Sequence, residues 1–353
     1  MLKNYRTIIA LSIIPQVLLL KLISNYPELV EAYYSKGLYI YISKALRFIF
    51  GWVPFSVGDV LYTVGIIYGV RWLYINRKRI INDTLLWLRD ILVVVSLIYF
   101  AFHLFWGLNY YRLPLHKSLG LANDYTTEQL ITVTKKLINS SNNVHLKVSH
   151  NDTIKVTIPY DKNTLMQNSS RGYEVLRATY PQLQPMPKSV KRSIYSLPSS
   201  YMAIGGYLNP FTNEGQINSL SPLHRFPNTI CHEQAHQIGF AAENETNFIG
   251  CLAAMNHDDP YYQYSGYIFA LKYCLLDLQK RDPNLYEQLI ENVHIGIRKN
   301  YQEEYDFWMD HENPFRPLFD STLNQYLKAN NQPKGIESYS YVVALLVNHF
   351  LDI

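Results

Sequence analysis

Residues 230–239 read Ile-Cys-His-Glu-Gln-Ala-His-Gln-Ile-Gly and place two imidazoles and a carboxylate at helical spacing. At 3.6 residues per turn, His232 and His236 lie on one face of a helix, about 6 Å apart along its axis. Two neutral imidazoles at that separation can share one Zn²⁺. Glu233 lies beside them, and in such sites this carboxylate takes a proton from the metal-bound water instead of binding the metal. The segment therefore predicts a catalytic zinc with Glu233 as general base.

A catalytic zinc with two histidine ligands needs a third protein ligand, and the nearest candidates are Glu243 and Glu245. An unbroken helix would carry Glu243 about 10 Å beyond His236, so the chain must turn back. Gly239 can end the helix in the left-handed conformation. Because the two glutamates point about 160° apart on a following helix, only one can face the metal. We prefer Glu243, since Asn247 at i+4 can hydrogen-bond it, and Glu245 remains the alternative.

The composition indicates one sizeable domain together with membrane segments. Of 353 residues, 48% are hydrophobic and only 17% are charged. The net charge of +4 is not gathered in a basic patch, which argues against nucleic acid as a partner. The three cysteines, Cys231, Cys251 and Cys274, lie in apolar helical patterns and are expected to be buried thiols without a disulfide.

Three apolar runs, 7–23, 52–74 and 91–108, approach the roughly 20 residues needed to cross a bilayer. Lys3 and Arg6 precede the first run, which lacks a small-residue cleavage site and so resembles a retained anchor. Any one run alone could instead be a buried core helix. We expect residues 1–111 to form a membrane anchor with about three transmembrane helices.

Cations crowd the connection between the second and third runs, namely Arg71, Arg77, Lys78, Arg79 and Arg89. Because positive loops stay in the cytoplasm, this connection and the N-terminus are expected on the cytoplasmic side. The first connection, 24–51, carries three cations of its own, which weakens the asymmetry. The expected protein is a multi-pass cell-membrane protein whose catalytic domain lies outside the cytoplasm.

From residue 112 onward the sequence becomes typical of a soluble domain. Thr126 and Gln129 form a capping box that opens a helix. Alternation over 147–159 predicts a half-buried strand, and two further strands are expected near Ile194 and over 204–208. A strand beside a metal site can hold a peptide by main-chain hydrogen bonds. Six helical segments follow the histidine motif, so residues 112–353 are expected to form an α+β domain with a small sheet and a mostly helical C-terminal part.

The segment His232-Glu233-Gln234-Ala235-His236, with Glu243-Asn244-Glu245-Thr246-Asn247, resembles the zincin metallopeptidases, in particular the gluzincins. The resemblance implies a zincin-like domain with zinc held by His232, His236 and a glutamate, and with Glu233 as base. Two features depart from that pattern. Gluzincins usually have an aspartate where Asn247 stands and a longer connection to the glutamate. The short turn is more like that of metzincins, which would have a histidine where Ala242 stands.

A second resemblance covers most of the chain. It is to a bacterial family of membrane-anchored proteins that carry this motif, and it implies no particular activity. The resemblance is carried by the metal motif and by three further segments, Trp106-Gly107-Leu108-Asn109-Tyr110-Tyr111, Tyr264-Ser265-Gly266-Tyr267 and Tyr339-Ser340-Tyr341-Val342-Val343.

We expect a membrane-anchored zinc-dependent hydrolase, a metallopeptidase that cleaves peptide bonds with help from Glu233. Its partners would be a peptide or protein substrate and the lipid bilayer. The alternative is a membrane-anchored binding or structural protein in which the metal site is degenerate or structural. Hydrolysis of a non-peptide bond is a third reading of the same residues.

Overall fold

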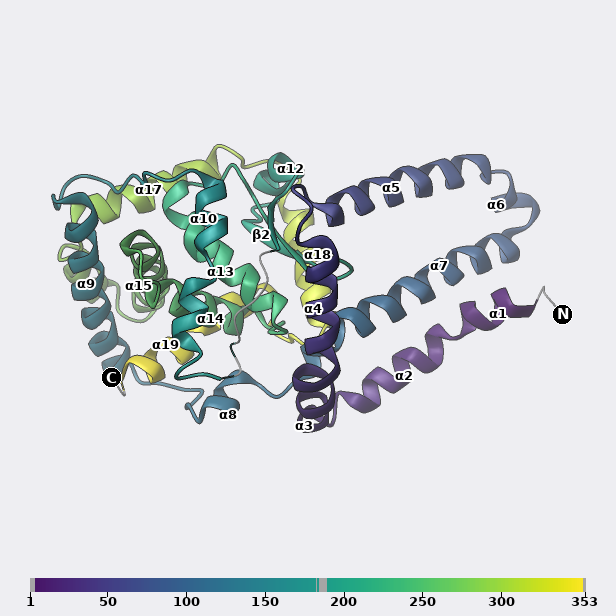
Figure 1. The fold of residues 1–353 in the computed structure, drawn as a ribbon, viewed down its shortest axis with the longest axis horizontal. Coiled ribbons are helices and arrows are strands. Elements are labelled where there is room, and N and C mark those ends of the chain that lie inside the picture. The colour runs from purple at the N-terminus through teal and green to yellow at the C-terminus, as the bar shows by residue number, and fades with distance from the viewer. Residues whose placement is uncertain (1–3, 182, 184–188, 352–353) are drawn as a thin grey trace.

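The chain has a body of helices around a small sheet, from which a layer of long helices projects (Figure 1). The computed structural model describes residues 4–181, 183 and 189–351. Lys3, which precedes the first apolar run, lies outside this description. The fold is mostly helical with one small mixed sheet, which is consistent with the predicted α+β class.

The projecting helices are α1 (Asn4–Leu11), α2 (Ile13–Ile23), α5 (Val57–Ile75), α6 (Arg79–Asn82) and α7 (Thr84–Phe105). The first pair forms one kinked rod, because Pro15 has no N–H to donate to the carbonyl of Leu11. Near the kink, Ser12 and Gln16 hydrogen-bond the buried Ser96 of α7, both at 2.9 Å. Polar contacts of this kind hold helices together where apolar side chains face lipid.

Two spans in this layer are long and apolar enough to cross a membrane, Tyr5–Ile23 and Thr84–Phe105. In the apolar 18-residue window of each span, only 11% and 6% of the residues are buried within the protein, so their apolar side chains point outward. The predicted run 52–74 is helical only from Val57 onward, as α5. Trp72 of this helix stacks on Trp87 of α7 with ring centroids 6.2 Å apart. Helix α5 is not one of the two spans that are long and apolar enough to cross a membrane, so its role as a transmembrane helix stays a prediction.

A helix that the sequence did not reveal lies between the projecting layer and the body (Figure 1). It comprises α3 (Pro27–Leu29), a π-helical stretch η1 (Val30–Leu38) and α4 (Tyr39–Phe50). Its buried stripe runs through Val30, Tyr34, Tyr39, Ser43 and Arg47, with one five-residue step inside the π-helical stretch. Because the stripe contains polar residues and changes period, it does not produce the regular apolar pattern of an amphipathic helix.

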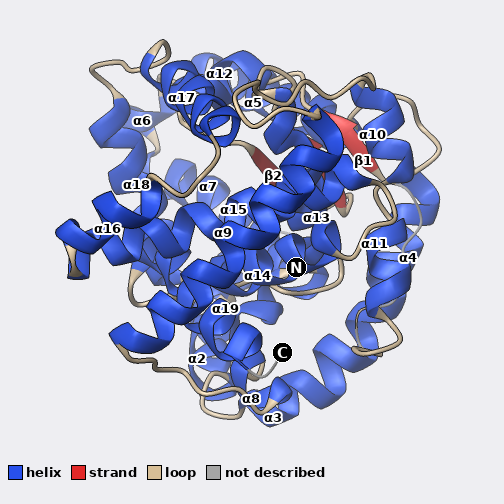
Figure 2. Cartoon of the chain, turned by 90° about the vertical axis from the view of Figure 1, so that its left-hand side faces the viewer, coloured by secondary structure: helices blue, strands red, loops and turns tan. Residues whose placement is uncertain are grey.

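The sheet has three short strands, β1 (Val190–Arg192), β2 (Gly206–Asn209) and β3 (Glu214–Ile217), in the order β1-β3-β2. β1 runs parallel to β3, and β2 runs antiparallel to it, so β2 forms one edge. Figure 2 shows how small this sheet is among the surrounding helices. The two strands expected near 194 and 204–208 correspond to β1, shifted by a few residues, and β2.

The strand predicted over 147–159 is wrong. Helix α9 (Thr127–Ser149), opened by the predicted capping box at Thr126, continues through the first of these residues, and 150–159 contain no strand. Val156 and Ile158 are buried as the alternation implied. The backbone N–H of Val156, however, donates to the side chain of Asn300 at 3.0 Å instead of to a neighbouring strand.

The remaining helices build the body, most of whose buried apolar side chains form one large core cluster. They are η2 (Gly107–Tyr111), α8 (Leu115–Leu119), α10 (Lys162–Asn168), α11 (Arg171–Leu176), α12 (Ser196–Tyr201), η3 (Leu223–Arg225), α13 (Phe226–Gln237), α14 (Glu243–Met255), α15 (Pro260–Arg281), α16 (Pro283–Ile290), α17 (Ile295–Met309), α18 (Arg316–Ala329), η4 (Gly335–Tyr341) and α19 (Val342–Leu351). The helices expected after the histidine motif are confirmed. All three cysteines are free and fully buried in this core, as predicted.

Candidate metal centre

Helix α13 carries the histidine motif and is fixed by its buried face. Ile230, Cys231 and Ala235 are fully buried in the core, so the opposite face turns His232 and His236 toward a cavity. The two imidazole rings lie with centroids 4.8 Å apart. The helical spacing of the motif thus brings the rings together as expected.

The chain reverses immediately after α13. Gly239 has φ of +90°, a left-handed conformation that glycine adopts without a steric penalty, and α14 begins at Glu243. Helix α14 then packs closely on α13, because a Cβ at Gly250 would lie 2.8 Å from the Cα of His232. The turn and this close approach bring the first residue of α14 back to the two histidines.

His232, His236 and Glu243 converge on one point. Glu243 Oε2 lies 3.4 Å from His232 Nε2 and 3.7 Å from His236 Nε2. Ligands bonded at 2.0–2.1 Å to one tetrahedral zinc are separated by about 3.3–3.5 Å, so these separations fit a shared ion. Glu243 Oε2 is buried and has no hydrogen-bond partner among the described residues. In the part of the chain that the structure describes, these three residues form the one group able to hold a metal ion.

Glu245, the alternative third ligand, faces away from this group. Its Oε1 accepts a hydrogen bond from the backbone N–H of Leu115 at 2.6 Å. Burial raises the pKa of Glu245 to about 7, despite that bond. The structure therefore assembles Glu243 with the histidines and leaves Glu245 in a contact with the start of α8. Asn247, expected to support Glu243, is buried one turn further along α14 and lines the cavity.

The electrostatics of the three residues suit a cation. His236 Nδ1 donates to the carbonyl of Phe240 at 2.8 Å, which leaves Nε2 facing Glu243. Burial alone would lower the pKa of His236, but Glu243 raises it to about 9. Burial would likewise raise the pKa of Glu243, but the imidazoles hold it well below its usual value. Metal ligands of this kind must be deprotonated, so metal binding by the three residues would release protons and depend on pH.

Glu233 lies beside the three clustered residues without joining them. Its side chain packs against β2, because a Cβ at Gly206 would lie 2.6 Å from Glu233 Oε1. Its Oε2 is buried and has no hydrogen-bond partner among the described residues. Burial raises its pKa to about 7, against the opposing effect of His232 and His236. A carboxylate with this pKa is suited to accept and return a proton near neutral pH.

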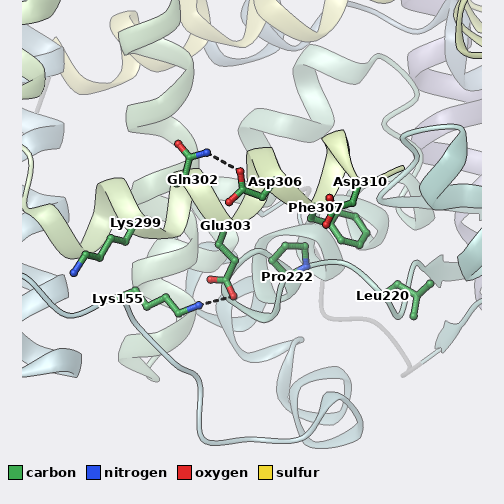
Figure 3. Close-up of a pocket in the computed structure, with 9 residues that line it drawn as sticks. All are labelled: Lys155, Leu220, Pro222, Lys299, Gln302, Glu303, Asp306, Phe307 and Asp310. Carbon is green, nitrogen blue, oxygen red and sulfur yellow. Dashed lines mark hydrogen bonds and ion pairs between the residues drawn. The ribbon is translucent and has the colours of Figure 1, made fainter. Parts of the chain in front are cut away.

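All four residues line one cavity of about 610 Å³. Its wall is built from β2, α13, α14, α15, α17, α18 and the end of α7. Another hollow, of about 510 Å³, lies along α17 and contains none of the four (Figure 3). Four of its polar side chains are already paired, Lys155 with Glu303 and Gln302 with Asp306. The cavity with the histidines is therefore the candidate active site.

The cavity continues along α13 to a charged cluster that the sequence did not indicate. Arg225 and Lys272 both contact Oε1 of the buried Glu304, the latter at 2.7 Å. Burial would raise the pKa of Glu304, but the two cations lower it to about 2. These residues lie on η3, α15 and α17, so only the folded chain brings them together. Arg225, Lys272 and Glu304 together give this end of the cavity one net positive charge.

Tyr207 of β2 lines this cavity, where a tyrosine hydroxyl could donate to a developing oxyanion. Its hydroxyl donates to Oδ1 of the buried Asp59 at 2.6 Å, so its proton is already engaged. Tyr264 instead donates to Asn300 inside the core. Tyr326 of α18 does line the cavity, and its hydroxyl accepts from that of Tyr110 at 3.4 Å.

The last carbonyls of α13, which cannot bond within the helix, are satisfied by side chains from the N-terminal third of the chain. Four side chains donate to carbonyls at and just after this end: Trp106 to His236, Tyr39 and Arg47 to Gln237, and Arg112 to Gly239. Arg112 is itself fixed by a buried ion pair with Glu31 at 2.8 Å. Residues on both sides of the expected domain boundary at 111 thus position α13, the helix that carries His232 and His236.

Replacing Arg47 by Met tests this positioning. The buried Arg47 guanidinium donates to the Gln237 carbonyl at 2.9 Å and to Asn213 Oδ1 at 2.7 Å. We expect Arg47→Met to lower the free energy of unfolding by about 1.5–3 kcal/mol, the cost of losing bonds from a charged donor. Thermal unfolding in detergent measures it. The control is Lys44→Met on the exposed side of the same helix, and equal midpoints for the two variants would show that the contact is dispensable.

A family model described as "Protein of unknown function (DUF3810)" matches residues 34–347. Since this match covers most of the chain, the chain belongs to that family. No curated protein and no solved structure matches the chain.

Proposed function

We propose that this member of the DUF3810 family is a membrane-anchored, zinc-dependent hydrolase that cleaves peptide bonds. The observation that carries the proposal is the convergence of His232, His236 and Glu243 on one point, beside a buried Glu233 that is not part of the group. Two imidazoles, a carboxylate and a separate glutamate form the donor set of zinc hydrolases of the zincin type. A purely structural zinc would be expected to have four protein ligands.

The chain's own residues would divide the chemistry as follows. A bound zinc ion supplies a lowered pKa for water and polarisation of a carbonyl oxygen. Glu233 accepts the proton of the attacking water and returns it to the leaving amine, for which its raised pKa is suited. The Nδ1 bond of His236 to Phe240 fixes the ring that would bind the metal.

The edge strand β2 favours a polypeptide as the substrate. It lies at the end of the sheet order and lines the cavity with Gly206, Tyr207 and Leu208. An extended peptide can pair with such an edge through main-chain hydrogen bonds, which would set its carbonyls beside Glu233. A small-molecule ester or amide has no extended main chain and could not form this row of hydrogen bonds with β2.

The projecting helices support a position in the cell membrane, with the body outside the cytoplasm. The start of α1 and helix α6 lie at the same far tip of the layer (Figure 1). Arg6 lies 3.7 Å from Asp90, which also pairs with Arg79 and Arg89. A tip this rich in arginine is typical of a cytoplasmic loop.

Metal analysis of the protein purified in detergent tests the proposal. We expect about one zinc per chain, and a loss of peptidase activity on chelation that added zinc restores. His232→Ala should lower the bound zinc, whereas His311→Ala, a change on the C-terminal side of α17, should leave it unchanged. Stoichiometric zinc without hydrolysis of any peptide would favour a structural metal, and the absence of zinc would reject the proposal.

A further inference from the structure

Helix α13, which carries His232 and His236, directly contacts the end of a candidate membrane span. Helix α7 ends at Phe105, and the next residue, Trp106, donates its indole N–H to the carbonyl of His236 at 3.1 Å. The rings of Trp106 and His236 lie with centroids 5.8 Å apart. Since a span of this length ends near the surface of the bilayer, the proposed metal site lies at that surface.

Strand β3, which pairs with the edge strand β2, contacts the start of the neighbouring projecting helix. Helix α5 begins at Val57, and the N–H of Gly58 donates to Glu214 Oε2 at 2.7 Å. Glu214 is fully buried and begins β3, the partner of β2. A carboxylate at a helix N-terminus is favoured by the helix dipole, so this contact fixes the β2–β3 hairpin on the membrane side.

Membrane-side residues also form part of the cavity wall. Phe102, in the last turn of α7, lines the cavity together with Trp106 and Tyr110. The same cavity follows one face of α13 to Arg225, eleven residues before His236, or about 17 Å away. An extended peptide rises about 3.3 Å per residue, so about five residues fill this length. The catalytic residues lie toward the membrane end, and the charged cluster around Glu304 lies at the other.

We infer that the substrates are membrane-anchored polypeptides whose scissile bond lies within a few residues of the bilayer surface. The inference rests on the proposed peptidase function and narrows its substrate class. A polypeptide segment that leaves the bilayer beside Phe102 and Trp106 reaches the proposed metal ligands before it reaches the charged cluster around Glu304. A peptide bond far from the membrane anchor of its polypeptide would have to return to the bilayer surface to reach this site, so it would be cleaved more slowly.

Lipid-linked peptides of different spacer length test the inference. The protein is placed in phosphatidylcholine nanodiscs with fluorogenic peptides of five randomised residues, joined to a phospholipid headgroup by Gly/Ser spacers of two or thirty residues. Effective concentration falls roughly as the −3/2 power of spacer length, so we expect the short-spacer peptides to be cleaved at least about tenfold faster. The same peptides without lipid should be cleaved more slowly still.

A binding readout separates this inference from the proposed function. The Glu233→Gln variant is mixed with the same peptides carrying a photoreactive group, and crosslinks to the cavity are counted by mass spectrometry. Preferential crosslinking of short-spacer peptides without any cleavage by the native protein would support the preference for polypeptides anchored close to the bilayer and reject the peptidase. Equal cleavage at both spacer lengths would support the peptidase and overturn the inference. Equal crosslinking, or none with either spacer, would overturn it as well.

Discussion

We expect hydrolysis to fall by about 10²–10⁴-fold when Glu233 is replaced by Gln, and bound zinc to be retained. The change keeps the size of the side chain and removes its ability to accept a proton. Glu233 is not among the three converging ligands, and its Oε1 lies instead against Gly206 of β2. The amide can occupy the same space, so the metal content should not change. Steady-state cleavage of a fluorogenic peptide and metal analysis of the same sample give both quantities.

Glu291→Gln is the matched control, because it makes the same chemical change on an exposed side chain. Its activity should equal that of the native protein. If Glu233→Gln retained full activity with zinc bound, another group would have to be the base. If it lost zinc together with activity, Glu233 would be acting as a ligand, and the division of roles proposed for the four residues would fail.

The local part of the site could be predicted because it depends on helix geometry alone. The spacing of His232 and His236 sets their shared face, and Gly239 provides the turn. The opposite directions of Glu243 and Glu245 on α14 follow from the same geometry. The structure shows the former beside the histidines and the latter bonded to Leu115. Local spacing was sufficient here because the residues involved are only eleven or so positions apart.

The non-local part could not be predicted, since nothing in the sequence marks which distant residues meet. Arg47 appeared to be a loop cation, yet it is buried against the carbonyl of Gln237. Trp106 falls inside the apolar run 91–108, yet its indole N–H donates to the carbonyl of His236. The alternation around Val156 reflects burial without strand pairing, because Asn300 takes the place of a neighbouring strand. Periodicity reports which side chains are buried, and it does not report what the backbone bonds to.

The second large effect is expected on zinc affinity, when the proposed third ligand Glu243 is replaced. Glu243→Gln should weaken zinc binding by more than about 100-fold, beyond the 10–100-fold typical of residues that only support a ligand. The amide keeps the size of the side chain but loses the charge that faces the two imidazoles at 3.4 Å and 3.7 Å. Activity at limiting zinc should fall by the same factor and recover in part at high zinc. Competition with a fluorescent zinc chelator measures the affinity.

Glu245→Gln makes the identical change two residues further along the same helix and serves as the control. Its side-chain oxygen can still accept the bond from the Leu115 N–H, so the start of α8 stays in place. Zinc affinity should then change by less than about tenfold, since this side chain neither faces the metal nor hydrogen-bonds a ligand. A large loss in this variant with a small one in Glu243→Gln would exchange the two roles. Equal large losses would mean that the turn after Gly239 is rearranged when zinc binds, because the geometry shown here allows only one of the two to reach the histidines.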